Sequence, residues 1–60
     1  MKFAVHQGRA KLVSVDGGSM ADVERASGGS LPSDPNACFA RWTDVVAFAK
    51  TSISYDEPCD

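Results

Sequence analysis

The dipeptide Gln7-Gly8 constrains the fold most, because it separates two short runs in which apolar and polar residues alternate. A two-residue loop ending in glycine is the commonest connection of a β-hairpin. With residues 2–6 and 9–15 as strands, His6 pairs with Arg9, and Phe3 with Leu12. The apolar face of this hairpin then carries Phe3, Val5, Ala10 and Leu12, and the basic face carries Lys2, Ala4, His6, Arg9, Lys11 and Val13. A slip of one residue would mix the two faces, so the alternation predicts the register as well as the hairpin.

A glycine-containing stop follows the hairpin, and a short helix is expected after it. Asp16-Gly17-Gly18 favours a turn, and Ser19-x-x-Asp22 resembles a capping box at a helix start. We predict a helix over residues 20–27 that ends at Gly28. Residues 28–35 have the composition of a loop.

The clearest helix signal starts at Asp34-Pro35, where aspartate suits the N-cap and proline suits the first helical position. We predict a helix over residues 35–51. Its apolar face spans an arc of about 120° and is predicted to pack in the core; it carries Cys38, Phe39, Trp42, Val45, Val46, Ala49 and Ile53. One alternative stays open, in which residues 37–42 form a strand and the helix begins at Thr43.

The C-terminal part of the chain gives weaker signals. Residues 50–55 suit a short closing strand, because Ile53 and Tyr55 alternate with serines. Residues 56–60 are expected to form a flexible tail. The whole pattern predicts one small α+β domain over residues 1–60, a β-hairpin packed against one amphipathic helix, with a short connecting helix and a third strand as an option.

The composition is that of a globular chain, with 43% hydrophobic and 23% charged residues. A domain of this size buries only about 60% of the surface that its unfolded chain exposes, so its own core provides only a small free energy of folding. A partner or a second copy can supply part of the stability. We therefore expect a monomer or a small homo-oligomer.

Catalytic, cofactor and metal sites are not expected. His6 is the only histidine, and no serine lies in a Gly-x-Ser-x-Gly nucleophile motif. Asp16-Gly17-Gly18-Ser19 lacks the lysine of a phosphate-binding loop and carries an acid where an anion would bind. Cys38 and Cys59 lack the close spacing of zinc-binding cysteines. We predict that the protein is not an enzyme.

The N-terminus has no apolar run like that of a signal peptide, and no stretch approaches the ~18 apolar residues of a membrane span. We therefore predict a cytoplasmic protein that does not bind a membrane. In a reducing compartment Cys38 and Cys59 are expected to be free thiols, with their pairing as the open alternative.

Charge suggests the function. The net charge is −2, with eight acids against six lysines and arginines. We predict that an acidic surface binds a partner protein with a basic surface. Phe48 lies off the apolar stripe beside charged residues, where it either widens the core face, the interpretation that a small domain favours, or is exposed as an interface hot spot. The expected partner-binding residues are Asp22, Glu24, Asp44, Phe48, Asp56, Glu57 and Asp60.

An inhibitor or adaptor that masks the nucleic-acid-binding surface of its partner fits this prediction. One concrete form is a phage-encoded anti-defence protein, such as an anti-CRISPR protein in the host cytoplasm, suggested by size, acidity and the lack of motifs. The alternative is a small nucleic-acid-binding protein whose basic hairpin face contacts phosphates. It would use Lys2, His6, Arg9 and Lys11. This alternative is the weaker one, because four groups make a small patch on an acidic chain.

Overall fold

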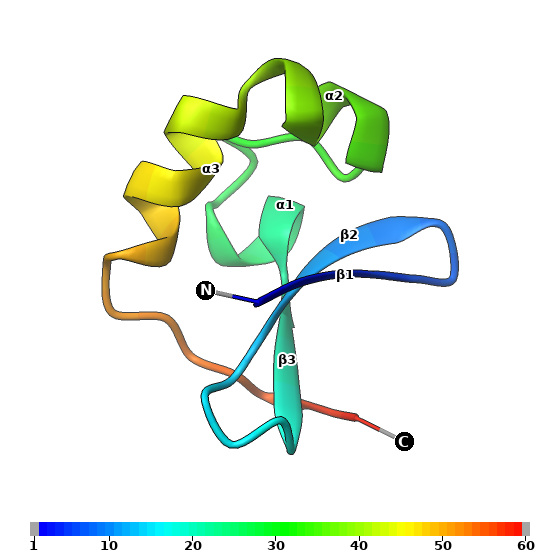
Figure 1. The fold of residues 1–60 in the computed structure, drawn as a ribbon, viewed down its shortest axis with the longest axis vertical. Helices are drawn as coiled ribbons and strands as arrows, with labels where there is room; N and C mark the ends of the chain where they lie inside the picture. The colour runs from blue at the N-terminus through cyan, green and yellow to red at the C-terminus, as the bar shows by residue number, and fades with distance from the viewer. Residues whose placement is uncertain (1, 60) are drawn as a thin grey trace.

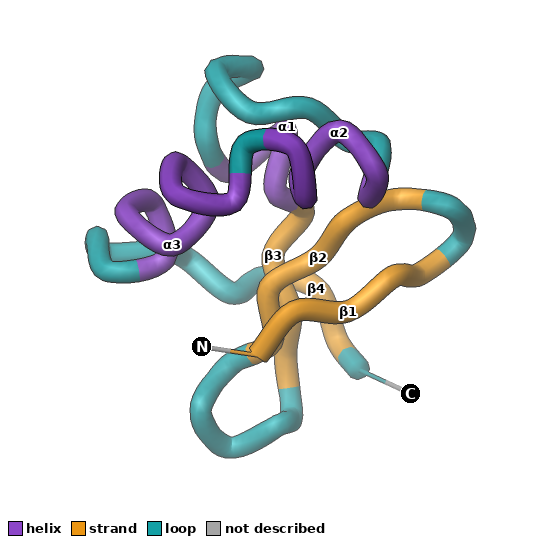
Figure 2. Tube along the Cα trace, turned by 45° about the horizontal axis from the view of Figure 1, so that its top comes forward, coloured by secondary structure: helices purple, strands orange, loops and turns teal. Residues whose placement is uncertain are grey.

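The computed structural model describes residues 2–59 and confirms the α+β fold. Its antiparallel sheet has four strands in the order β1-β2-β3-β4. The strands are β1 (Lys2–His6), β2 (Arg9–Val13), β3 (Ser19–Asp22) and β4 (Glu57–Pro58). The helices are α1 (Val23–Ala26), α2 (Pro35–Ala40) and α3 (Trp42–Ala49). Figure 1 and Figure 2 both show the helices gathered on one side of the sheet.

The predicted hairpin and its register are confirmed. His6 pairs with Arg9, and Phe3 with Leu12, as the alternation requires. Gln7 and Gly8 have φ angles of 53° and 75°, the left-handed pair of a type I′ turn, which matches the twist of the strands it joins. The second strand ends at Val13, two residues before the predicted end.

The helix predicted over residues 20–27 begins too early. Met20 and Ala21 belong to β3, which pairs with β2, and only Val23–Ala26 are helical. In this strand the side chains of Met20 and Ala21 are both buried. Asp22 caps the helix instead, and its carboxylate accepts a 3.0 Å hydrogen bond from the N–H of Arg25.

The helix predicted over residues 35–51 starts where expected but is divided in two. Asp34 caps α2, accepting from the N–H of Ala37, and Pro35 is its first residue. The strand alternative over residues 37–42 is wrong. Arg41, with φ −120° and ψ 37°, separates α2 from α3, and its guanidinium donates a 2.9 Å hydrogen bond to the carbonyl of Ser30. No glycine or proline marks this break, which coincides with a contact between the helix and a distant loop.

The closing strand lies later in the chain than predicted. Residues 51–56 form neither helix nor strand, whereas Glu57 pairs with Met20 and Pro58 with Ser19. The N–H of Cys59 also donates to the carbonyl of Gly18 at 3.2 Å. Glu57, Pro58 and Cys59, which belong to the tail predicted to be flexible, therefore have backbone partners in β3 or next to it. Asp60 lies outside the described residues.

The core lies between the sheet and the helices. Its buried residues are Ala10, Leu12, Val23, Leu31, Cys38 and Val45. Both cysteines are free, as expected, and the Cys38 thiol donates to the carbonyl of Pro32. Among the described residues, no helix has the length and apolar character needed to cross a membrane.

Replacement of Leu12 by alanine should lower the free energy of unfolding by about 2–5 kcal/mol. The Leu12 side chain is only 1% exposed, so its removal leaves a cavity in the core. Urea unfolding followed by Trp42 fluorescence measures the change. Val15→Ala is the control, since Val15 is fully exposed and should change stability by less than about 0.5 kcal/mol. Equal losses in the two variants would contradict this account of the core.

Candidate protein-interaction surface

Two residues of the predicted basic face are paired within the chain. The Arg9 guanidinium binds Asp22 at 2.7 Å and Glu24 at 2.9 Å. The Lys11 ammonium binds Asp22 at 3.1 Å and Glu57 at 2.7 Å. These five side chains form an ion-pair network that joins β2 to β3, α1 and β4.

The centre of the network is buried. Lys11 is 3% exposed and Asp22 is 5% exposed, values at which an unpaired charge would be costly. The hydrogen bond from the Arg9 guanidinium, with further bonds from the Arg25 N–H and from Lys11, outweighs burial and holds the pKa of Asp22 well below its usual range. Burial alone would lower the pKa of Lys11, but its bonds to Glu57 and Asp22 raise it. Both groups are therefore charged over the physiological range.

The network takes up several residues that the sequence assigned to binding. Asp22, Glu24 and Glu57 all lie in it. Of the other predicted acids, exposed Asp44 pairs with Arg41 at 3.2 Å, and Asp56 is exposed. The pairings of the ion-pair network join residues 11 to 46 positions apart, which no local pattern reveals. Partner binding by these acids stays a prediction.

Three other predicted site residues, Phe48, Lys2 and His6, lie outside the ion-pair network. Phe48 is half-buried and packs against the core. Lys2 and His6 have no ion-pair partner among residues 2–59, because the described ion pairs use neither. Of the four residues in the nucleic-acid alternative, only these two are left without an acid.

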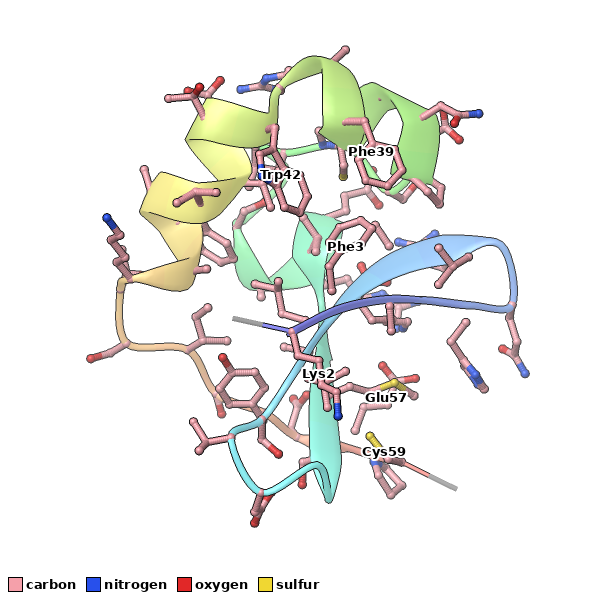
Figure 3. The ribbon with its side chains drawn as sticks, viewed as in Figure 1. Lys2, Phe3, Phe39, Trp42, Glu57 and Cys59 are labelled. Carbon is pink, nitrogen blue, oxygen red and sulfur yellow. The ribbon has the colours of Figure 1, made fainter. Side chains whose placement is uncertain are left out.

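An exposed group of apolar side chains, which sequence reasoning missed, lies where the hairpin meets the helices. Phe3 of β1, Phe39 of α2 and Trp42 of α3 form a triangle, with ring centroids 5.3–5.6 Å apart. Figure 3 shows the three side chains pointing toward one another. Val5 lies on the same face of β1 as Phe3, two residues along. We call these four residues the aromatic patch.

Much of the aromatic patch faces solvent. Phe39 is 57% exposed, Val5 is 56% exposed and Trp42 is 37% exposed. The helical stripe predicted Phe39 and Trp42 as core residues, and this is corrected. The stripe predicts which way a side chain points, but it cannot predict whether the chain has enough residues to cover it. The small size of the chain was the available signal.

An open hollow of about 670 Å³ lies beside the end of the hairpin and α3. Most of its lining is apolar, and its charged lining residues are Lys2 and Lys50. Its lining includes no acid and no cysteine. Elsewhere within residues 2–59, no three His, Cys, Asp or Glu side chains gather as metal ligands would.

Stability should depend on pH through Asp22. Its pKa is lowered by folding, so its contribution is complete above the unfolded pKa of about 4 and is lost as the pH falls further. Asp22→Asn should cost about 3 kcal/mol at pH 7, because it breaks a buried ion pair. The difference from the native protein should shrink as the pH falls below 4, measured by urea unfolding at each pH.

Asp44→Asn serves as the control, because its carboxylate is exposed and should contribute less than about 1 kcal/mol at any pH. Some pH dependence should survive in Asp22→Asn, since hydrogen bonds from the Ser14 hydroxyl and the Gly18 N–H lower the pKa of Asp16 as well. A difference between Asp22→Asn and the native protein that is the same at pH 7 and pH 2 would contradict this account.

Comparison of the chain with models of protein families, with curated proteins and with solved structures finds no match. The proposal that follows therefore rests on the residues of this chain.

Proposed function

We propose that this protein is a protein-binding module and that the aromatic patch is its binding surface. The observation that carries the proposal is the half-exposed cluster of Phe3, Phe39 and Trp42 beside exposed Val5. Aromatic side chains are enriched at the centres of protein interfaces and among hot spots. A contiguous apolar patch is uncommon on the surface of a soluble domain unless it binds something.

The patch is ordered before any partner arrives. Each of its three rings contacts the other two, which restricts their rotamers. The Asp34 cap fixes the start of α2, and the bond from Arg41 to Ser30 holds the junction between α2 and α3. A surface that is already ordered loses less conformational entropy on binding, so more of the contact energy appears as affinity.

The inhibitor or adaptor role belongs to this proposal, but the charge argument for it is weaker. Masking a basic surface needs acids that are open to a partner, and the ion-pair network engages Asp22, Glu24 and Glu57. Apolar contact is therefore the main contribution we propose, with Asp44 and Asp56 as acids that remain exposed. The phage-encoded anti-defence form stays a prediction from size and acidity.

Affinity capture from native lysate tests the proposal, with the tagged protein, nuclease treatment and mass spectrometry. A protein partner should survive nuclease, and Phe39→Ser should reduce its recovery at least about tenfold, as expected for the loss of a hot spot. Val15→Ser is the matched control, because it also removes exposed apolar surface, but outside the patch. The thermal unfolding midpoints of both variants should stay close to that of the native protein.

Two outcomes would contradict the proposal. Recovery that disappears with nuclease would favour the nucleic-acid alternative. Equal recovery with Phe39→Ser and Val15→Ser would mean that the aromatic patch does not bind the partner.

A further inference from the structure

The outer edge of β1 is open. β1 is the first strand in the sheet order, and β2 is the strand beside it in Figure 1 and Figure 2. The N–H of Ala10 donates a 2.8 Å hydrogen bond to the carbonyl of Ser33, so this N–H points away from β1. Ala10 and its neighbour Val5 therefore form a non-hydrogen-bonded pair.

The alternation of the ladder then decides which groups of β1 are unused. In a non-hydrogen-bonded pair the backbone groups of both residues point away from each other, so the N–H and C=O of Val5 point to the open edge. Phe3, two residues earlier, has the same orientation. No backbone hydrogen bond within the described residues outside the sheet ladder uses these groups. They are hydrogen-bonding positions for another strand.

The edge lacks most of the features that protect such strands. It contains no proline, its five residues pair with β2 without a bulge, and Phe3 and Val5 on one face are apolar. Only Lys2 and His6, on the other face, bring charge or polarity. An edge of this kind is a template for strand addition.

We propose that the partner adds an extended segment to β1 as a fifth, antiparallel strand. This inference rests on the proposed function and names the chemistry of the partner. Residues of the segment opposite Phe3 and Val5 would form hydrogen-bonded pairs with them and would lie on the face of the aromatic patch. Both should be apolar, because they would cover Val5 and approach the exposed rings.

Charge specifies the other face of the segment. Its residues opposite Lys2 and His6 form non-hydrogen-bonded pairs, whose Cα atoms lie about 4.5 Å apart, so that a carboxylate reaches the Lys2 ammonium. Lys2 has no acid within the described residues, and acids at these positions complement it. We therefore expect the five residues of the segment opposite β1 to be, in order, acidic, apolar, any residue, apolar and acidic.

A synthetic peptide tests this pattern directly. The blocked peptide Thr-Glu-Val-Thr-Val-Glu-Thr, titrated to millimolar concentration into the ¹⁵N-labelled protein, should shift the amide signals of Phe3 and Val5 and slow their hydrogen exchange. The matched peptide Thr-Lys-Val-Thr-Val-Lys-Thr should bind about tenfold more weakly, because the attractive pair with Lys2 becomes repulsive. Lys2→Glu should reverse that preference.

Val5→Pro tests the backbone hydrogen bonds of the edge. Proline is tolerated on an edge strand, and here it removes an N–H that no bond uses, so the hairpin should persist while peptide binding is lost. Val5→Thr keeps the N–H but loses apolar surface, so it should bind the peptide more weakly than the native protein and more tightly than Val5→Pro. Nuclear Overhauser contacts between Ala4 and Lys11 report whether the hairpin is intact; if it is not, Lys2→Glu with the two peptides decides the question.

Several results would overturn the inference. They are unchanged Phe3 and Val5 signals at millimolar peptide, full binding by a folded Val5→Pro variant, and equal affinity of the native protein for the two peptides. Concentration-dependent shifts of these signals without peptide would mean that a second copy occupies the edge, which also overturns it. If a captured partner depends on Phe39 but not on the N–H of Val5, the proposed function stands and the strand addition falls.

Discussion

The ion pairs of Lys11 with Asp22 and Glu57 join β2 to its ladder partner β3 and also to β4, which is not paired with β2 in the sheet. β4 has only two residues, and the bond from Lys11 to Glu57 ties it to β2, across 46 positions of sequence. A buried charge is costly unless it is paired, and each buried side-chain nitrogen and oxygen in the described part of the chain has a partner. Such pairs contribute little net stability compared with an apolar replacement, but they penalise every arrangement that separates them. A slip of β2 by one residue would move Lys11 into the core beside Val23.

This network also determines which surfaces stay open. The helices cover the face of β2 that carries Ala10 and Leu12, and the network covers the face that carries Lys11. β2 is thereby covered on both faces, whereas no side chain of β1 is fully buried, although Phe3 meets the rings of α2 and α3. The side chains available to a partner are therefore concentrated on the edge strand and the neighbouring helices. The same shortage of residues that leaves the core small leaves this part of the molecule exposed.

The parts of the fold that the sequence predicted are those with local causes. The hairpin register follows from alternation around Gln7-Gly8, and the start of α2 follows from Asp34-Pro35. The errors come from tertiary interactions that override local signals. Ser19–Asp22 looked like a helix start because the partner that makes it a strand lies in β2, and β4 had no alternation to reveal it.

The candidate site divides in the same way. The apolar stripe correctly identified Cys38 and Val45 as buried, but it could not indicate that Phe39 lies beyond the area that the sheet covers. The acids were counted correctly, yet the partners of Asp22, Glu24 and Glu57 lie between 11 and 46 positions away and are visible only in the fold. A count of charges treats every acid as available to a partner. Ion pairs within the chain engage some of these acids, and the number engaged differs from one surface to another.

That redistribution changes the partner that the charges favour. An acidic chain suggests a basic partner, because long-range steering follows the net charge. Contact specificity follows the local charges instead, and at the open edge the local charge is that of Lys2, while Arg9 and Lys11 are neutralised by acids of the chain itself. At this edge, therefore, the docking segment is expected to carry the acids, although the protein as a whole is acidic. The net negative charge of the protein then steers the approach of the partner, whereas the positive charge of Lys2 governs docking at the edge. This combination favours a partner whose acidic strand lies within a less acidic surface.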